Sequence, residues 1–249
     1  MLSAKSETFI ENLRLYLVTS GKKEKEINEL TEELEVHLIE AEKDGKNIEE
    51  IIDCTPEQYM NSLKKEMDTD VKSLTKYLPI FFTGVAAYFI MGPAIRGELT
   101  FNIVQVIGFP LTAITGLLIY VLFLQQAGKK QFSTKTFFLF GMVASASVTI
   151  LFILLLLGST LFVEPFYAAS PTVNWIIVAV CSCIFILLAV WSKTWLTIWI
   201  PAILFIPDFL YRFSNFSDNA ILIIGMAMFV SMFIMIILSL FLKNKKLSV

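Results

Sequence analysis

The sequence predicts an all-α membrane protein in two parts: a small cytoplasmic helical domain over residues 1–70, then a six-helix transmembrane bundle over residues 71–249. Composition is the first reason, because 56% of the residues are hydrophobic and only 17% are charged, against roughly 25% in an average soluble domain. Charge distribution is the second reason. Residues 1–76 hold 18 acids and 11 bases, a net of −7, whereas residues 77–249 hold 4 acids and 9 bases, a net of +5.

The N-terminal domain is predicted to be a set of short amphipathic helices. Ser6 is placed to cap a first helix, which Gly21 ends, and a second helix is expected over residues 22–43, with Gly45 as its stop. Apolar residues recur at spacings of three and four, so they share one face of each helix. They are Phe9, Ile10, Leu13 and Leu17, then Ile27, Leu30, Leu34, Leu38 and Ala41.

Two capping signals follow the second helix. Asn47 with Glu50 resembles a capping box, in which the first side chain accepts a backbone amide and the residue three positions later answers it. Thr55 with Gln58 repeats the device, and Pro56 takes the first helical position, where its missing amide costs nothing. The last helix of the domain should run on towards the membrane and transmit motion rigidly. Its apolar positions are Tyr59, Leu63, Met67, Val71 and Leu74.

Three consecutive segments carry a family resemblance: "FIENLRLYL", "EINELTEELEVHLIEAEKDGKNIEEII" and "TPEQYMNSLKKEM". Together they resemble the HAAS domain, a helix-turn-helix-associated α-helical signalling module that is often fused to membrane helices in Firmicutes. The resemblance covers residues 5–67, about a quarter of the chain. The matching positions are Leu30, Leu34, Leu38, Gly45, Pro56, Glu57 and Tyr59.

This resemblance implies a signalling or regulatory role, often beside a PadR-type transcriptional regulator, and it implies no reaction. We expect a cytoplasmic protein partner, with Glu29, Glu33, Glu40 and Tyr59 as candidate docking residues. The acidic run on the second helix is either a solvated face or a docking surface for a basic partner helix. The negative net charge disfavours direct binding of nucleic acid, which depends on neutralising phosphates with Lys and Arg.

Six apolar stretches are long enough to cross the lipid bilayer, which takes about 20 residues. They are Tyr77–Ile95, Thr100–Leu124, Thr136–Gly158, Val173–Trp191, Trp195–Phe213 and Asn219–Leu242. Eleven lysines flank the spans on the side of the N-terminal domain, whereas only Arg96 and Arg212 flank them on the other. Because cytoplasmic loops are rich in basic residues, both chain ends are predicted to lie in the cytoplasm of a bacterium, with the spans in its cytoplasmic membrane.

Four polar residues of the spans form a candidate intramembrane site. Asp208 is the one carboxylate within a span, where a charge at the bilayer centre costs about 2.5–3.5 kcal/mol. It either pairs with Arg212, four residues on and on the same helix face near the external interface, or forms a ligand or proton site. Asn102 and Gln105 share one face near the external end of the second span.

Prolines and small residues should shape the packing of the spans. Pro201 and Pro207 are expected to bend the fifth span, because each removes an amide donor and clashes with the preceding turn. Small residues repeated every four positions let helices approach closely, which also leaves homo-oligomerisation open. These residues are Gly108, Thr112 and Gly116 in the second span, and Gly141, Ser145 and Thr149 in the third.

No motif indicates catalysis, a cofactor or a metal. The sequence lacks a phosphate-binding Gly-x-x-x-x-Gly-Lys-Ser/Thr loop, and His37 with Cys54 cannot supply the four ligands of structural zinc. We expect a non-enzyme without a cofactor. The favoured function is a membrane-embedded signalling protein that responds to an envelope or membrane signal. The alternatives are an accessory or self-protection subunit associated with a transporter, and a transporter in its own right.

Overall fold

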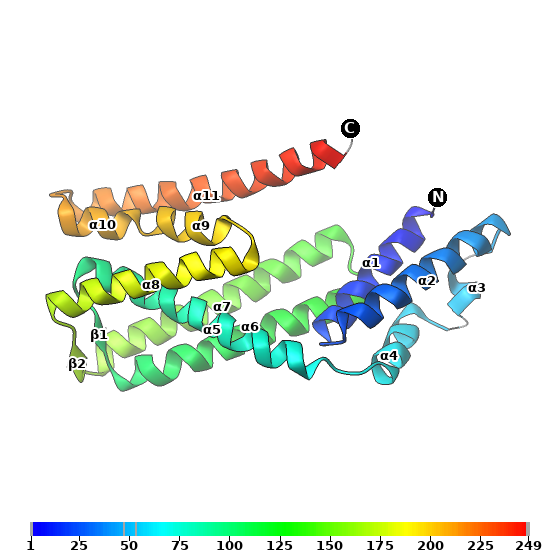
Figure 1. The fold of residues 1–249 in the computed structure, drawn as a ribbon, viewed down its shortest axis with the longest axis horizontal. Helices are drawn as coiled ribbons and strands as arrows, with labels where there is room; N and C mark the ends of the chain where they lie inside the picture. The colour runs from blue at the N-terminus through cyan, green and yellow to red at the C-terminus, as the bar shows by residue number, and fades with distance from the viewer. Residues whose placement is uncertain (1, 47, 53, 248–249) are drawn as a thin grey trace. The chain divides into compact units, whose positions relative to one another are not determined.

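The structure, a computed structural model, describes residues 2–46, 48–52 and 54–247. It confirms the all-α fold: short helices at the N-terminal end are followed by long apolar helices (Figure 1). The described residues contain one small sheet, in which two-residue strands pair antiparallel. The fold therefore follows the division of the sequence into a polar and an apolar part.

The chain divides into two compact units. The first combines Met1–Leu78 with Gly108–Leu157, and the second combines Pro79–Ile107 with Gly158–Val249. Each unit is thus built from segments distant in sequence. The N-terminal domain does not stand alone, because it shares the first unit with parts of two apolar helices.

The N-terminal helices, which we call the module, surround one hydrophobic core. They are α1 (Ala4–Thr19), α2 (Glu24–Lys43), α3 (Ile48–Ile52) and α4 (Pro56–Glu66), blue to cyan in Figure 1. The predicted apolar stripes face this core, because one side chain per helical turn is removed from water. Its buried members are Phe9, Leu13, Tyr16, Leu17, Ile27, Leu34, Leu38, Ile52 and Met60.

Of the helix caps predicted in the module, the one at the start of α4 is confirmed and the one at the start of α1 is wrong. Thr55 and Gln58 form the predicted capping box at the start of α4. The prediction of Ser6 as the first cap was wrong, because Ser3 caps α1 and accepts a hydrogen bond from the Ser6 amide. Ser6 is buried and donates instead to Glu42 at 2.6 Å. The predicted pair of Asn47 and Glu50 includes a residue outside those the structure describes.

Continuity between the module and the first span was predicted wrongly. Helix α4 ends at Glu66, and Met67 has an extended backbone, with φ −79° and ψ 145°. A new helix, α5 (Val71–Arg96), begins after Asp70, whose carboxylate accepts the Ser73 amide at 3.0 Å. An extended connection cannot act as the rigid rod that the apolar spacing suggested.

Among the residues that the structure describes, five helical segments are long and apolar enough to cross a membrane. The sixth predicted span corresponds to α11, whose apolar part is Asp218–Met232 among the residues described in full, shorter than the other five. A multi-pass membrane protein is therefore confirmed. The five spans are α5, α6 (Ile103–Lys129), α7 (Thr134–Phe162), α8 (Pro171–Ser192), and α9 (Leu196–Leu204) with α10 (Ile206–Phe213) as one segment.

The two halves of the fifth span are separated at Phe205, as its prolines predict. Pro201 lies inside α9, and Pro207 occupies the first turn of α10. In the second unit, α9 and α10 both contact α11. Phe205 is itself buried and packs near Tyr88 and Phe185, so the break is filled by aromatic side chains.

Small residues position α6 against α7 in the first unit, as predicted. A Cβ atom at Gly108 would collide with Leu155, and one at Gly116 would lie 3.2 Å from Val148. The Tyr120 hydroxyl also lies 3.0 Å from that of Ser145. Close approach through glycines replaces the hydrophobic drive that lipid cannot provide between helices.

The second unit has its own apolar core. Helix α5 packs on α8 through buried residues that include Met91 and Phe185. The sheet joins β1 (Thr100–Phe101) to β2 (Tyr167–Ala168), so the segments that follow α5 and α7 are paired.

Candidate functional site

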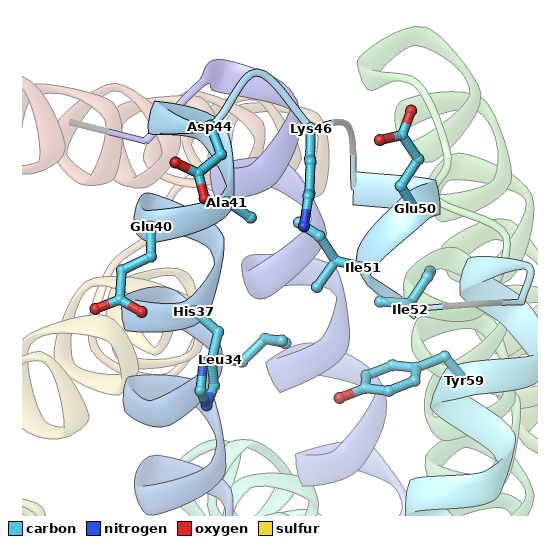
Figure 2. Close-up of a pocket in the computed structure, with 10 residues that line it drawn as sticks. All are labelled: Leu34, His37, Glu40, Ala41, Asp44, Lys46, Glu50, Ile51, Ile52 and Tyr59. Atoms are coloured by element: carbon cyan, nitrogen blue, oxygen red, sulfur yellow. The ribbon is translucent and has the colours of Figure 1, made fainter.

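A pocket of about 540 Å3 opens in the module between α2 on one side and α3 with α4 on the other (Figure 2). We call it the α2–α4 pocket; ten residues line it, all labelled in Figure 2. Its apolar lining includes Leu34 and Ile52, which belong to the core of the module. A cavity of this size suits a small ligand or an anchoring side chain of a protein partner.

Tyr59 forms one wall of the α2–α4 pocket. Its ring lies 6.1 Å from the ring of Phe9, measured between centroids, so the core fixes its position. Burial raises the pKa of Tyr59 above its ordinary value. Figure 2 shows this hydroxyl directed towards the pocket, where it can donate or accept a hydrogen bond.

The predicted docking residues separate into two pairs. Glu40 and Tyr59 line the α2–α4 pocket together. Glu29 and Glu33 lie elsewhere on the exposed face of α2, where Glu33 is 3.8 Å from His37 and Glu29 is 3.5 Å from Lys25. The acidic run therefore lies partly on an exposed face of α2 and partly in the lining of the pocket, and its role in docking stays a prediction.

A second region joins the module to α6. Gly128, near the end of α6, is buried, and a Cβ atom added there would lie 2.8 Å from the Asn12 carbonyl oxygen. The same atom would lie 3.1 Å from the backbone nitrogen of Tyr16. Backbones of α1 and α6 thus approach so closely that only glycine fits.

Polar contacts flank this glycine on both sides. The amide of Gln125 donates to the Thr19 carbonyl at 2.8 Å, and Lys129 pairs with Glu57 at 2.8 Å. Lys129 holds the pKa of Glu57 below its usual range through this hydrogen bond. We call these interactions, with those of Gly128, the α6 contact.

The α6 contact was not predicted from the sequence. There Lys129 and its neighbours indicate only topology, because a charge pair between distant segments leaves no periodicity. The usable signal is the stretch "QQAGKK", in which Ala127 and Gly128 precede the basic pair. Two small residues at the end of a span permit close packing of another helix.

The connection between α4 and α5 is fastened to the turn between α1 and α2. The Asp70 amide donates to the Gly21 carbonyl at 2.8 Å, and the Lys22 ammonium donates to the Met67 carbonyl at 2.7 Å. Lys23 and Asp68 form an ion pair at 2.7 Å, which raises the pKa of Lys23 and lowers that of Asp68. An extended chain is therefore held by the module itself.

Charged residues of the second unit form a polar cluster around α10. Asp208 pairs with Arg96 at the end of α5, so the expectation of an ion pair with Arg212 was wrong. Arg212 donates instead to the Ile95 carbonyl at 2.8 Å, and its guanidinium lies 4.6 Å from the centre of the Trp175 ring. The two basic residues therefore bind different partners, although they lie in one cluster.

The packing of two glycines explains why Asp208 pairs with Arg96 and Arg212 binds backbone carbonyls. Glycines admit both polar groups: Asp208 lies against Gly92, and the guanidinium of Arg212 lies against Gly97. Gly97 has φ +80°, a left-handed conformation that ends α5 and leaves carbonyls for Arg212. The polar cluster ties α5 to α10 and α8 through the ion pair of Asp208 with Arg96 and through the carbonyl and ring contacts of Arg212.

Asn102 and Gln105 form a helix cap. The backbone amide of Gln105 donates to the side-chain oxygen of Asn102 at 2.8 Å, and the backbone amide of Asn102 donates to the side-chain oxygen of Gln105 at 3.2 Å. Asn102 is buried and also donates to the Ser159 carbonyl at 2.9 Å. Both side chains are thus engaged in starting α6 and joining it to the end of α7.

Side chains that bind metals are dispersed. Across the described residues, no group of three or more His, Cys, Asp or Glu side chains is arranged to hold a metal ion. Cys181 is buried and Cys183 is exposed, because residues two positions apart on a helix face different ways. Neither helix face therefore offers a cysteine pair.

Comparison with known proteins matches residues 88–204 to the HAAS transmembrane region. The matched segment runs from within α5 to the end of α9, and it supports a HAAS-domain membrane protein. It follows the part of the chain whose sequence resembles the HAAS domain, residues 5–67, and residues 68–87 lie between the two. No curated protein and no solved structure matches the chain.

Proposed function

We propose that this HAAS-domain membrane protein is a signalling protein whose module binds a cytoplasmic partner, such as a PadR-type transcriptional regulator, according to the state of its spans. The observation that carries the proposal is the α6 contact. Through Gly128 and Lys129 the module packs directly on an apolar helix, so a movement of α6 has a physical route to the module. The proposal includes no reaction.

The chemistry of the α6 contact suits reversible coupling. Its ion pair is partly exposed, with 24% of the Lys129 side chain and 48% of the Glu57 side chain accessible. Such pairs contribute little because both charges are well hydrated when separated. A contact of small free energy can shift between two states when a signal changes one of them by only a few kcal/mol.

Topology supports a cytoplasmic module. Lysines flank the module side of the predicted spans, and Lys129 and Lys130 lie at the end of α6 that contacts the module. Basic residues are retained on the cytoplasmic side of bacterial membranes. We propose that the protein lies in the bacterial cytoplasmic membrane with both ends in the cytoplasm.

The test is capture of partners by the full chain in its native membrane. Wild type, Gly128→Leu and the matched Gly158→Leu variant would be purified after mild cross-linking, because a Cβ at Gly158 meets nothing within 4 Å. Recovery of a transcriptional regulator whose amount changes in Gly128→Leu alone supports the proposal. Recovery of a transporter ATPase, or identical partners in all three proteins, favours the accessory-subunit alternative.

A further inference from the structure

We propose that the α2–α4 pocket is a docking site for a basic segment of a partner protein that inserts an apolar anchor side chain. The inference rests on the proposed function, because it names the chemistry of the partner and the place where it binds. Three properties of the pocket carry it: an apolar floor, an acidic rim and a hydroxyl that faces the cavity.

The floor of the pocket is apolar and firmly supported. Leu34 and Ile52 are both 7% exposed and continue into the core, while Ala41 and Ile51 line the cavity and are half-buried. An apolar side chain placed here would leave water for a preformed surface. Burial of such an anchor in a rigid pocket is the usual centre of binding energy in protein interfaces.

The rim of the pocket is acidic. Glu40, Asp44 and Glu50 line the pocket and are exposed. Figure 2 shows the carboxylates of Glu40 and Glu50 directed outward, and the Lys46 ammonium directed towards Ala41 and Ile51. In the described part of the chain none of the three forms an ion pair, so their charges are not neutralised by the module. Lys46 supplies one opposing charge, and the rim therefore remains net negative.

The hydroxyl of Tyr59 gives the pocket a directional contact. It forms no hydrogen bond within the described residues and is directed towards the cavity in Figure 2. A tyrosine with a buried ring and an accessible hydroxyl contributes contact area at low conformational cost. A partner segment can therefore combine an apolar anchor with one hydrogen bond.

Charge complementarity selects a basic occupant. An acidic rim repels nucleic acid and other anions, and it lowers the free energy of a segment with Lys or Arg beside its anchor. The net of −7 over residues 1–76 extends this preference over the whole module and would steer such a partner towards it. The occupant that fits the pocket is thus a basic, amphipathic segment of a cytoplasmic protein.

The experiment uses the full chain in nanodiscs of zwitterionic lipid and a fluorescent helical peptide with a leucine face and a lysine face. Two matched peptides replace lysine by glutamate or leucine by alanine. Fluorescence anisotropy measures binding to the protein, and empty nanodiscs give the contribution of lipid.

The decisive variants carry equal changes of net charge. The rim variant combines Glu40→Lys, Asp44→Lys and Glu50→Lys, and the control reverses exposed glutamates of α2 that do not line the pocket: Glu24→Lys, Glu32→Lys and Glu35→Lys. All six side chains are exposed, so both proteins should fold. A third variant, Ala41→Phe, fills the pocket without altering charge.

We expect the rim variant to weaken binding of the basic peptide by about tenfold or more, and the control to weaken it by much less. Ala41→Phe should weaken it by a similar factor, because it competes with the anchor. Equal losses in both charge variants, no effect of Ala41→Phe, or equal binding of the glutamate peptide would overturn the assignment. If the full chain still captured a regulator but the peptide tests failed, the proposed function would stand and the α2–α4 pocket would not be the docking site.

Discussion

The α6 contact and the polar cluster are both made of charges and close-packed glycines, but they lie in different surroundings. The α6 contact joins the module to the end of a span through Gly128 and one ion pair. The polar cluster lies among apolar helices and joins three of them through Asp208, Arg96 and Arg212. The two carboxylates differ most, because the side chain of Glu57 is 48% accessible and that of Asp208 is 17% accessible.

This difference assigns different roles to similar chemistry. A charge released from the α6 contact becomes hydrated, so opening costs little. A charge released within the spans loses its partner where water is scarce, and the penalty is several kcal/mol. The polar cluster should therefore act as a permanent fastening, and the α6 contact as the releasable one.

The largest effect is expected from Arg96→Ala. It leaves Asp208, whose side chain is only 17% exposed, without its ion-pair partner. We expect the free energy of unfolding to fall by about 3 kcal/mol. Thermal unfolding in detergent micelles measures it.

Glu98→Gln is the control for Arg96→Ala. Glu98 is half-exposed and lies 3.3 Å from Arg96, so it loses an interaction without leaving a buried charge. A loss as large as that of Arg96→Ala would contradict the fastening role. If the Asp208→Asn protein inserted normally but did not signal, Asp208 would instead be the ligand or proton site predicted as an alternative.

The next effect is expected from Gly128→Leu. Leucine favours helices by up to about 1 kcal/mol over glycine, so any destabilisation must come from the collision with α1. We expect a net loss of about 1–3 kcal/mol from the α6 contact. Trypsin should cleave the module faster, whereas Gly158→Leu should leave cleavage unchanged.

The sequence predicts the parts of the fold that repeat. Stripes of leucine at helical spacing located α1 and α2, and the prolines at 201 and 207 located the break in the fifth span. It misplaced the end of α4, because the apolar spacing of Met67 and Val71 continued across a turn held by Gly21 and Lys22. Contacts between distant segments override a local pattern.

The candidate site was predictable only in part. Glu40 and Tyr59 were identified, yet nothing in the sequence shows that α3 brings Glu50 to the same pocket. The partner of Asp208 was misassigned for the same reason. Arg96 is 112 positions away, and sequence spacing describes only neighbours on one helix.

A smaller effect is expected from acid. Because Lys129 lowers the pKa of Glu57, this carboxylate stabilises the α6 contact fully above its ordinary value of 4.5, and the stabilisation is lost as pH falls through the lowered pKa. The α6 contact should therefore open more readily below about pH 4.5. Tryptic cleavage after a brief acid pulse measures the opening.

Glu57→Gln provides the comparison for this pH dependence. Glu42 and Asp68 also have lowered pKa values, so the module itself will respond to acid. The contribution of the α6 contact is the difference between wild type and Glu57→Gln. If tryptic cleavage depended on pH identically in the two proteins, Glu57 would not contribute to the opening of the α6 contact.

The smallest effect is expected in the connection between α4 and α5. Thr69→Gly alters an extended segment that already interrupts the helix, so the loss of stability should stay below about 1 kcal/mol. Partner capture should remain at the wild-type level. If Thr69→Gly abolished the dependence of partner capture on the spans, the connection between α4 and α5 would be the route of the signal, and α6 would not.

Hydrogen exchange of the module in the full chain tests most directly whether α6 is the route between membrane and module. Amides of α1 and α4 would be compared in wild type, Gly128→Leu and Gly158→Leu by mass spectrometry. The account predicts exchange faster by about tenfold in Gly128→Leu alone, because those helices lose their support. Equal exchange in all three proteins would contradict it.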